Sequence, residues 1–433
     1  MGSIRCIPLL PGAALAALEL LVSCGGPGAD SRLEQGPSAK TAAVGKSESK
    51  AKTRPAEVTA AMILSPLADG APDPALVQAD NGLGRELFRR LRRQDPGGNL
   101  LLSPVSAAKA LQLTFAGAGG ATRDGMALAL GVQGVDTAAL NAANGVLLAD
   151  LAPGEPDVAL VLANSLWQKG TQVYPAYQKT AQGAYGAEVG DLGPGPQAVN
   201  AWMAAKTHGL IKTVVSPDAH LGPDALLLAN SVYFKASWSI PFEPHFTAQA
   251  PFTRADGSQV ACSMMFRAGT FDYGESGRWQ ALRLPYGKGR FSMVLVLPRA
   301  GTALADLDPD PAPFLASLDC HWVLLRLPRF GVDFSGALDE PLKAMGMAQA
   351  FDPNRADFSL VGPLSRYIGA VVHAARMNVD EFGTVAAAGT VVQLSGTSLP
   401  DKEMTLDRPF LFMILDGKSG EVIFLGQVGD PTR

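Results

Sequence analysis

Two apolar runs near the C-terminus place the strongest constraint on the fold. Residues 410–415 and 422–427 flank the turn sequence DGKSG of residues 416–420, which is the pattern of a β-hairpin. A half-exposed hairpin would be apolar at every second position, but here nearly every position is apolar, so both faces must be buried. A chain of 433 residues, of which 47% are hydrophobic and 18% charged, has enough apolar side chain to enclose it. We therefore expect a large folded core around this segment.

Four further apolar runs, at residues 159–167, 226–234, 291–297 and 322–327, are short enough to predict buried strands rather than helices. Residues 103–106 (SPVS) precede a run of small apolar residues at 107–118, which favours an N-capped helix closed by glycines. No second linker interrupts the chain after Pro74. The sequence thus predicts one large domain of mixed helix and sheet over residues 74–433.

The first residues have the pattern of a targeting signal. Arg5 supplies a short positive region, residues 7–22 are mostly apolar, and residues 21–24 (LVSC) are similar to the bacterial lipobox, whose cysteine is lipidated. We expect a lipoprotein signal peptide at 1–23, lipidation of Cys24, and a flexible Gly/Ser/Ala/Lys-rich linker within residues 24–73.

Such a protein would be extracytoplasmic, periplasmic or at the cell surface, and held to a bacterial membrane through the lipid anchor only. An ordinary cleaved signal peptide is the alternative. A membrane span is disfavoured because the apolar run is shorter than the ~20 residues that a spanning helix needs.

Motifs for catalysis and cofactor binding are missing from the sequence. It has no G-x-S-x-G, H-E-x-x-H, P-loop or Rossmann pattern, and its five histidines have no ligand spacing. We therefore expect no enzyme activity, metal or cofactor, although a triad assembled from distant positions would leave no motif. The net charge of −4 and the lack of a basic block in the folded part argue against a nucleic-acid partner. Cys262 and Cys320 are candidates for a disulfide that the sequence leaves open.

A series of ordered blocks resembles the serpin family. Each block is weak alone, but together they run in family order from about residue 78 to residue 433. The resemblance implies a monomeric α+β domain with a large central mixed sheet, further sheets, surrounding helices and an exposed reactive-centre loop at about 381–408. The main blocks are 99–106 (NLLLSPVS), 199–203 (VNAWM), 228–235 (LANSVYFK), 284–286 (LPY), 293–298 (MVLVLP), 327–330 (LPRF), 357–359 (DFS) and 408–412 (RPFLF).

Residues 379–390 (VDEFGTVAAAGT) resemble the hinge of that loop in inhibitory serpins. The resemblance implies that a target protease cleaves the loop, is trapped as an acyl-enzyme, and is distorted while the loop inserts into the main sheet as a new strand. The implied hinge residues are Glu381, Gly383, Thr384, Ala386, Ala387, Ala388 and Thr390.

The hinge residues themselves suit such an insertion. Alternate side chains of a strand point to opposite faces, so one parity, beginning with Thr384, must enter the core during insertion. No residue of this parity from 384 to 394 is charged, and no proline occurs before Pro400. Either would disfavour a buried strand. Phe382 and Val385 depart from the glutamates usual in the family, and a small-residue surface loop without a special role is the alternative interpretation.

Family spacing places the scissile bond after Thr397 or Ser398, depending on the end of the loop from which it is counted. A small residue there favours an elastase-like or subtilisin-like protease. Leu394 and Leu399 offer a chymotrypsin-like or papain-like enzyme a second choice, and residues 377–401 contain no arginine or lysine for a trypsin-like enzyme. The expected partner is therefore an endopeptidase of one of these kinds, held in a covalent complex.

Five other residues match family positions that control opening of the sheet. Ser103, Ser106, Asn230 and His373 match the shutter, where strands part to admit the loop, and Trp238 matches the breach, where insertion begins. Buried polar groups must be hydrogen-bonded, so a cluster that re-pairs during opening would govern how readily the strands separate. The alternatives are four unrelated satisfied groups, with the serines capping a helix, and an ordinary core tryptophan.

The sequence thus predicts an inhibitor of serine or cysteine endopeptidases. Two rival functions stay open. The first is a non-inhibitory surface lipoprotein that uses the same fold for binding. The second is a hydrolase whose site leaves no sequence motif.

Overall fold

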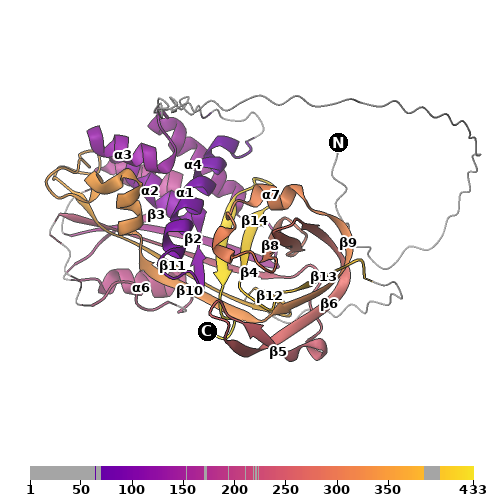
Figure 1. Cartoon of the computed structure of the whole chain (residues 1–433). Helices are drawn as coiled ribbons and strands as arrows, with labels where there is room; N and C mark the ends of the chain where they lie inside the picture. Colours follow the sequence, from indigo (N-terminus) through magenta and orange to yellow (C-terminus); the bar gives the residue numbers. More distant parts are fainter. Residues whose placement is uncertain are drawn as a thin grey trace, which may run out of the picture. The chain divides into compact units, whose positions relative to one another are not determined.

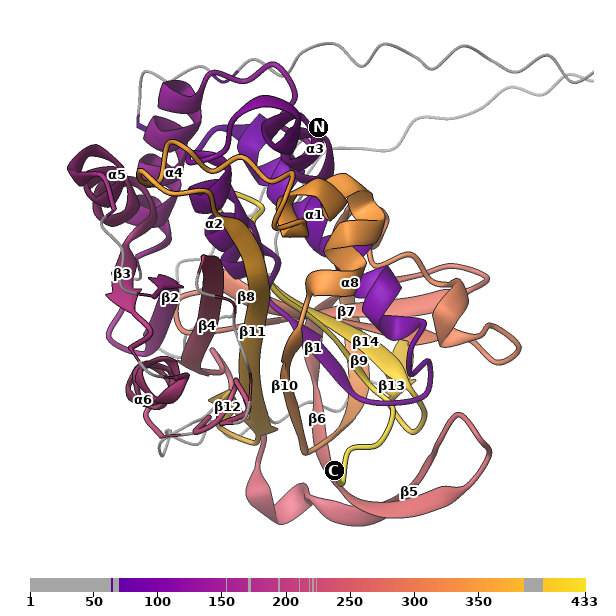
Figure 2. The same cartoon turned by 90° about the vertical axis from the view of Figure 1, so that its left-hand side faces the viewer.

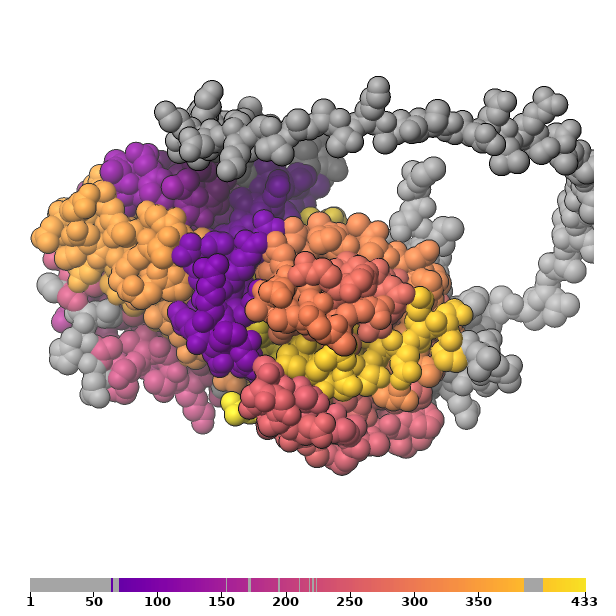
Figure 3. Space-filling model, viewed as in Figure 1, coloured from indigo at the N-terminus to yellow at the C-terminus, as the bar shows by residue number. Residues whose placement is uncertain are grey.

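The computed structural model describes Leu64, residues 70–384 and residues 400–433, apart from residues 153, 170–172, 194, 210, 218, 220, 221 and 223. Helix α1 (Pro74–Arg92) opens the folded part with a proline in its first turn, and the Asp73 side chain caps it by accepting from the N–H of Ala75 at 2.8 Å. Figure 3 shows the indigo residues of this helix at the surface between residues coloured orange.

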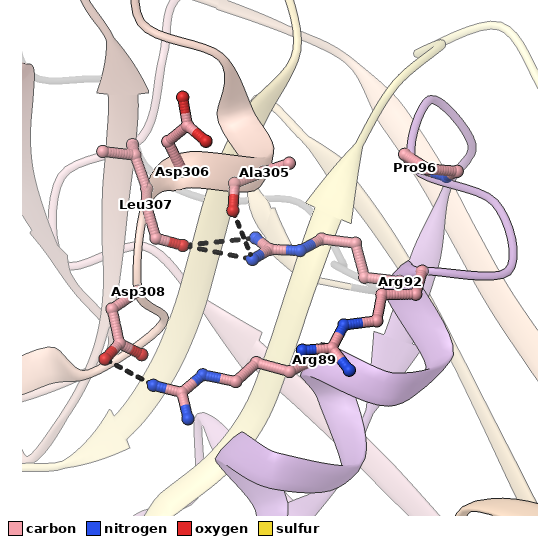
Figure 4. A pocket seen from close by; sticks show the side chains of 8 residues that line it. Arg89, Arg92, Pro96, Ala305, Asp306, Leu307 and Asp308 are labelled. Carbon is pink, nitrogen blue, oxygen red and sulfur yellow. Dashed lines mark hydrogen bonds and ion pairs between the residues drawn. The ribbon is translucent and has the colours of Figure 1, made fainter. Parts of the chain in front are cut away.

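The basic end of α1 is fixed to the segment 304–308. Arg92 donates to the main-chain oxygens of Ala305 and Leu307 at 3.0 and 3.2 Å, and Arg89 pairs with Asp308 at 2.6 Å (Figure 4). These cations also offset the partial negative charge at the C-terminus of the helix. Both guanidinium groups line a pocket, where their contacts are with residues of this segment.

Within the described residues, a six-stranded sheet has the order β10-β11-β12-β4-β2-β3, which can be followed across Figure 2. β11 runs parallel to β4 and β2 parallel to β3, whereas the other pairs are antiparallel. The predicted α+β class with a mixed central sheet is confirmed. The strands are β10 (Phe330–Ala337), β11 (Tyr367–Asp380), β12 (Gly383–Thr384), β4 (Ala225–Ser237), β2 (Val158–Gln168) and β3 (Ala187–Asp191).

A second sheet, of nine strands in the described part of the chain, has the order β1-β15-β14-β8-β7-β6-β9-β13, with β5 paired to β6. Near its β1 edge lies the predicted hairpin of β14 (Phe410–Asp416) and β15 (Val422–Val428), which is buried at every residue and flanked by β8 and β1. The other strands are β1 (Leu100–Leu102), β5 (Ala248–Thr253), β6 (Gln259–Glu275), β7 (Trp279–Pro285), β8 (Phe291–Pro298), β9 (Asp319–Pro328) and β13 (Lys402–Thr405).

Different helices pack on the two faces of the six-stranded sheet. α2 (Pro104–Phe115) is buried at every residue, contacts β4 and β2, and is capped by Ser103, whose Oγ accepts from the N–H of Ser106 at 3.4 Å. α6 (Gln197–Lys206) packs on the opposite face through Trp202 and neighbouring apolar residues. Figure 1 shows α6 apart from α1, α2 and α3. The remaining helices are α3 (Gly120–Leu130), α4 (Thr137–Leu151), α5 (Pro175–Tyr185), α7 (Pro311–Ala316) and α8 (Asp339–Leu342).

Alternation along β4 and β11 defines the two faces. Leu226 and Leu228 of β4 belong to the core that contains α2, whereas Leu227 and Ala229 pack with α6. The same alternation holds in β11, where Val371 faces the core. A new strand between β4 and β11 would therefore meet the core with one parity and α6 with the other.

Candidate functional site

A cluster of buried polar groups joins β4, β11 and α2 at the centre of the sheet. Asn230 and His373 face each other in the parallel register, with His373 Nδ1 2.5 Å from Asn230 Oδ1. Ser106 Oγ donates to the same oxygen at 3.1 Å, and the N–H of Ser103 donates to His373 Nε2 at 3.1 Å. All four residues are fully buried. The structure thus brings the four shutter candidates into one hydrogen-bonded cluster.

The bonding pattern assigns a neutral imidazole to His373. Its Nε2 accepts from Ser103, so the ring proton is on Nδ1 and donates to Asn230. Burial lowers the pKa of His373 to about 3, which keeps the ring neutral at physiological pH. Because the bonds cross from β4 to β11 and from both strands to α2, the strands can separate only if these bonds break or re-form.

The first residues of the hinge already stand between the two strands. In β12, Gly383 pairs with Ser237 of β4, and Thr384 pairs antiparallel with both Ala236 of β4 and Val379 of β11. The direct pairing of β4 with β11 ends at Val232 and Ala375. The sheet is therefore open at this end. Thr384 lies inside it before any cleavage, whereas the sequence led us to expect that this side chain enters only during insertion.

A tight turn and a glycine cause this early entry. The Asp380 carboxylate accepts from the N–H groups of Phe382 and Gly383 at 2.9 and 3.2 Å, which reverses the chain directly after β11. Gly383 has φ 150°, and a Cβ atom there would lie 2.1 Å from the carbonyl oxygen of Ala236. Only glycine allows the backbone to come so close to β4.

Two aromatic residues surround the point of entry. Thr384 Oγ1 lies 2.6 Å from Tyr286 Oη, and burial raises the pKa of Tyr286, so its hydroxyl stays protonated. Trp238 stacks on Tyr286 with 4.3 Å between ring centroids, and its indole N–H donates to the main-chain oxygen of Asp380 at 2.9 Å. The breach candidate Trp238 therefore contacts the hinge. Tyr286 was not selected from the sequence, although it lies in one of the family-like blocks.

The base of the hinge is fixed by a buried carboxylate. Glu381 is 1% exposed and accepts from Arg329 Nε at 2.7 Å and from the Thr247 hydroxyl. Burial raises the pKa of Glu381, but hydrogen bonds from Arg329 and Thr247 outweigh that effect and hold the pKa below its usual value. The sequence selected Glu381 as a hinge residue but gave no partner, because the pairing depends on the fold.

The other end of the loop joins the second sheet. Lys402 begins β13, which runs parallel to β9, and its ammonium pairs with Glu275 at 2.6 Å. The loop thus leaves one sheet at Thr384 and enters the other at Lys402. The scissile-bond candidates Thr397 and Ser398, the hinge residues Ala386, Ala387, Ala388 and Thr390, and Cys24 all lie outside the described residues.

The described residues also bear on the cysteines, metals and membranes. Cys262 is a free, buried cysteine, so it does not pair with Cys320. In the part of the chain that the structure covers, no three His, Cys, Asp or Glu side chains come together as a metal site. The same residues include no helix long and apolar enough to cross a membrane.

The fold and this site define a class of protein, namely an α+β domain whose main sheet is split between two parallel strands and holds the first residues of a loop in the split. The family model described as Serpin (serine protease inhibitor) matches residues 78–431. The chain belongs to the serpin family.

Relatives cover nearly the whole folded chain. Mouse neuroserpin is 30% identical over 404 residues, 87% of this chain and 96% of its own length. Bovine leukocyte elastase inhibitor is 30% identical over 380 residues, 82% of this chain and 99% of its own. Among solved structures, that of the thermophilic serpin Tengpin in the native state matches with a TM-score of 0.74 and 28% sequence identity. The match covers 82% of this chain and 94% of the Tengpin chain. These similarities confirm the fold and support protease inhibition in general, since serpins are mostly inhibitors rather than catalysts.

Proposed function

We propose that this serpin is a suicide-substrate inhibitor of serine or cysteine endopeptidases, which holds its target as an acyl-enzyme while the cleaved loop inserts into the six-stranded sheet. The observation that carries the proposal is β12, whose residues Gly383 and Thr384 pair antiparallel with both β4 and β11 at the open end of the sheet. A strand that continues from Thr384 would first lie where β4 and β11 are not paired with each other, and from Val232 and Ala375 onward it would have to separate them.

The register of β12 predicts what each later residue would meet. Counted on from Thr384 and its partners Ala236 and Val379, each step along the loop is one step back along β4 and β11. Ala386 would lie between Phe234 and Met377, Ala388 between Val232 and Ala375, and Thr390 between Asn230 and His373.

This register matches residue chemistry to its surroundings. The alanines would face positions that are apolar and buried, where a small side chain needs little extra room. The hydroxyl of Thr390 would come between Asn230 and His373. Insertion must break the direct hydrogen bond between these two residues. A hydroxyl both donates and accepts, so it can replace that bond on each side.

The chemistry of trapping needs no catalytic group from this chain. The protease nucleophile would attack the carbonyl carbon of Thr397 or Ser398, the peptide bond would break, and the next residue's amine would take a proton and leave. The new chain end would stay bound as an ester of serine or a thioester of cysteine. Water would hydrolyse this bond unless insertion first displaces and distorts the protease. Inhibition therefore requires insertion to outrun deacylation.

The bait residues favour proteases with a small or shallow primary pocket. Thr397 and Ser398 suit elastase-like or subtilisin-like enzymes, and Leu394 or Leu399 suits a chymotrypsin-like or papain-like enzyme. One relative, from cattle, carries the name leukocyte elastase inhibitor, which supports the first of these.

Incubation with an elastase, subtilisin and papain, followed by denaturing gels and assays of the remaining protease activity, tests the proposal. With at least one enzyme, we expect a band at the summed mass that survives denaturation and a matching loss of activity. If all three enzymes stay active and no such band forms, the non-inhibitory binding lipoprotein is favoured. Sustained turnover of ester or peptide substrates would instead indicate a hydrolase.

The location is proposed from the lipobox-like residues 21–24. If Cys24 is lipidated, Cys24→Ala should move the protein from the membrane fraction of the bacterium to the soluble fraction, or block its processing. Incorporation of labelled fatty acid measures the same step. Cys6→Ala, within the segment expected to be removed, is the control and should keep both label and membrane attachment. Unchanged labelling of the Cys24→Ala protein would rule out this anchor.

A further inference from the structure

A buried group of charged side chains between α1, α2 and the start of β15 has no part in the site described above. Asp80 of α1, Lys109 and Gln112 of α2, and Glu421, which directly precedes β15, are all fully buried. Lys109 forms an ion pair with one carboxylate oxygen of Asp80, and Gln112 donates to the other at 2.6 Å. Asp80 thus has a matched charge and a donor on each oxygen.

Glu421 has neither. Among the described residues, no hydrogen-bond donor contacts either of its carboxyl oxygens. Its main chain is held in place, since its carbonyl accepts from the N–H of Asp416 at 3.0 Å. The side chain is therefore kept in the core by the geometry of the β14–β15 turn rather than by bonds of its own.

The charged and titratable groups around Glu421 come from every neighbouring element. Asp80 on α1 and Asp416 on β14 are acidic and disfavour a second negative charge, whereas Lys109 on α2 favours it. Asp416 is paired with Arg290, and the negative charge of Asp80 adds to the burial that raises the pKa of Tyr185 on α5. Among the residues that the structure describes, Lys109 is thus the one cation near the two carboxyls of Asp80 and Glu421.

Both carboxyls cannot be charged without leaving an uncompensated negative charge in the core. Burial raises the pKa of both Asp80 and Glu421, but the hydrogen bonds from Lys109 and Gln112 oppose the rise only for Asp80. In the described part of the chain, no group donates to the carboxyl oxygens of Glu421. The proton therefore resides on Glu421.

We propose that Glu421 is a proton-binding site in the core and that the native form is most stable while this proton is bound. The site is connected to the Asn230–His373 cluster through α2, because Ser103, Ser106, Lys109 and Gln112 follow each other at every third position and bond to β11, β4 and α1 in turn. A charged Glu421 would compete with Asp80 for Lys109 and would weaken the packing of α1 and α2 against β15. The proposal does not depend on the inhibitory function.

The sign of the pH effect follows from the raised pKa. The carboxyl of Glu421 has a higher pKa in the folded chain than its ordinary value of 4.5. Its contribution to stability is fully present below that ordinary value and is lost as the pH rises through the folded-state value. The protein should therefore become less stable as the pH rises, and a neutral side chain at this position should remove that loss.

Thermal unfolding of the full chain between about pH 5 and about pH 9 tests this, with Glu421→Gln as the variant. Glutamine has the same shape and no proton to lose. The melting temperatures should differ little at the acid end, and at the alkaline end the variant should melt about 5 °C or more above the wild type. Glu340→Gln, which changes an exposed side chain, is the control and should follow the wild type throughout.

A direct readout keeps the test decisive if the variant does not fold. Infrared spectra of the chain labelled with carbon-13 glutamate separate protonated glutamate from every aspartate. The wild type should retain a protonated glutamic acid band well above the pH at which exposed glutamates titrate, and Glu421→Gln should lack it. Absence of this band in the wild type, or parallel melting curves for the wild type and Glu421→Gln, would overturn the proposal.

Discussion

Cleavage of the loop near Thr397 should raise the melting temperature of the protein by about 15 °C or more, where an ordinary nicked loop would leave it equal or lower. The reason lies in the open end of the six-stranded sheet. There β12 contributes only Gly383 and Thr384, and the edges of β4 and β11 can accept a longer strand on both sides. We expect the connection to β13 to prevent this before cleavage, because β13 pairs with β9 in the other sheet. Cleavage removes that restraint.

Calorimetry of intact and cleaved protein, purified after limited digestion, measures the change. The cut must be placed by mass spectrometry, and the fragment from residue 398 or 399 onward should stay bound through β13. Digestion at a site outside the loop is the control and should give no gain. An unchanged or lower melting temperature after cleavage near Thr397 would show that the native sheet stores no such stabilisation.

Thr384→Arg should turn the inhibitor into a substrate, with the yield of stable covalent complex lowered about tenfold or more. Thr384 is fully buried against Tyr286, so an arginine there must bring a charge into the core or expel the hinge from the sheet. Raising the activation free energy of insertion by ~1.4 kcal/mol already lowers its rate about tenfold. The bait around Thr397 is unchanged, so the protease should cut the same bond, complete deacylation and remain active.

Val385→Arg is the matched control. It adds the same charge one residue later, on the parity that the register directs away from the core and toward the α6 face. It should lower complex formation much less than Thr384→Arg. Gels and stoichiometric titration of an inhibited protease measure both variants. If the two substitutions have equal effects, whether both harmless or both severe, the insertion parity is wrong.

The elements with the strongest local signals were predicted from the sequence. The C-terminal hairpin and the strands that became β2, β4, β8 and β9 are continuous apolar runs, and Ser103 with Pro104 marks the start of α2 through short-range capping. The order of strands in the sheets was not predicted from local signals. β11 lies beside β4 because segments distant in the sequence pack together. Local pattern contains no information on that pairing.

The site divides in the same way. Residue type and family-like blocks were enough to select Asn230, His373 and Trp238. The structure places Asn230 and His373 where β4 and β11 pair, and Trp238 at the hinge. The sequence analysis did not select Tyr286 and Arg329, because their partners Thr384 and Glu381 are distant in sequence. The early entry of Thr384 was also missed, because it depends on how closely Gly383 approaches Ala236.

The most direct test of the account is a crystal structure of the protein cleaved near Thr397. It should show residues 384 to about 394 as a strand between β4 and β11, antiparallel to both, in the register that begins with Thr384 opposite Ala236. Ala386 and Ala388 should face the core, and Thr390 should stand between Asn230 and His373. A cleaved structure in which β4 and β11 still pair directly through Asn230 and His373, with the loop outside the sheet, would contradict the account.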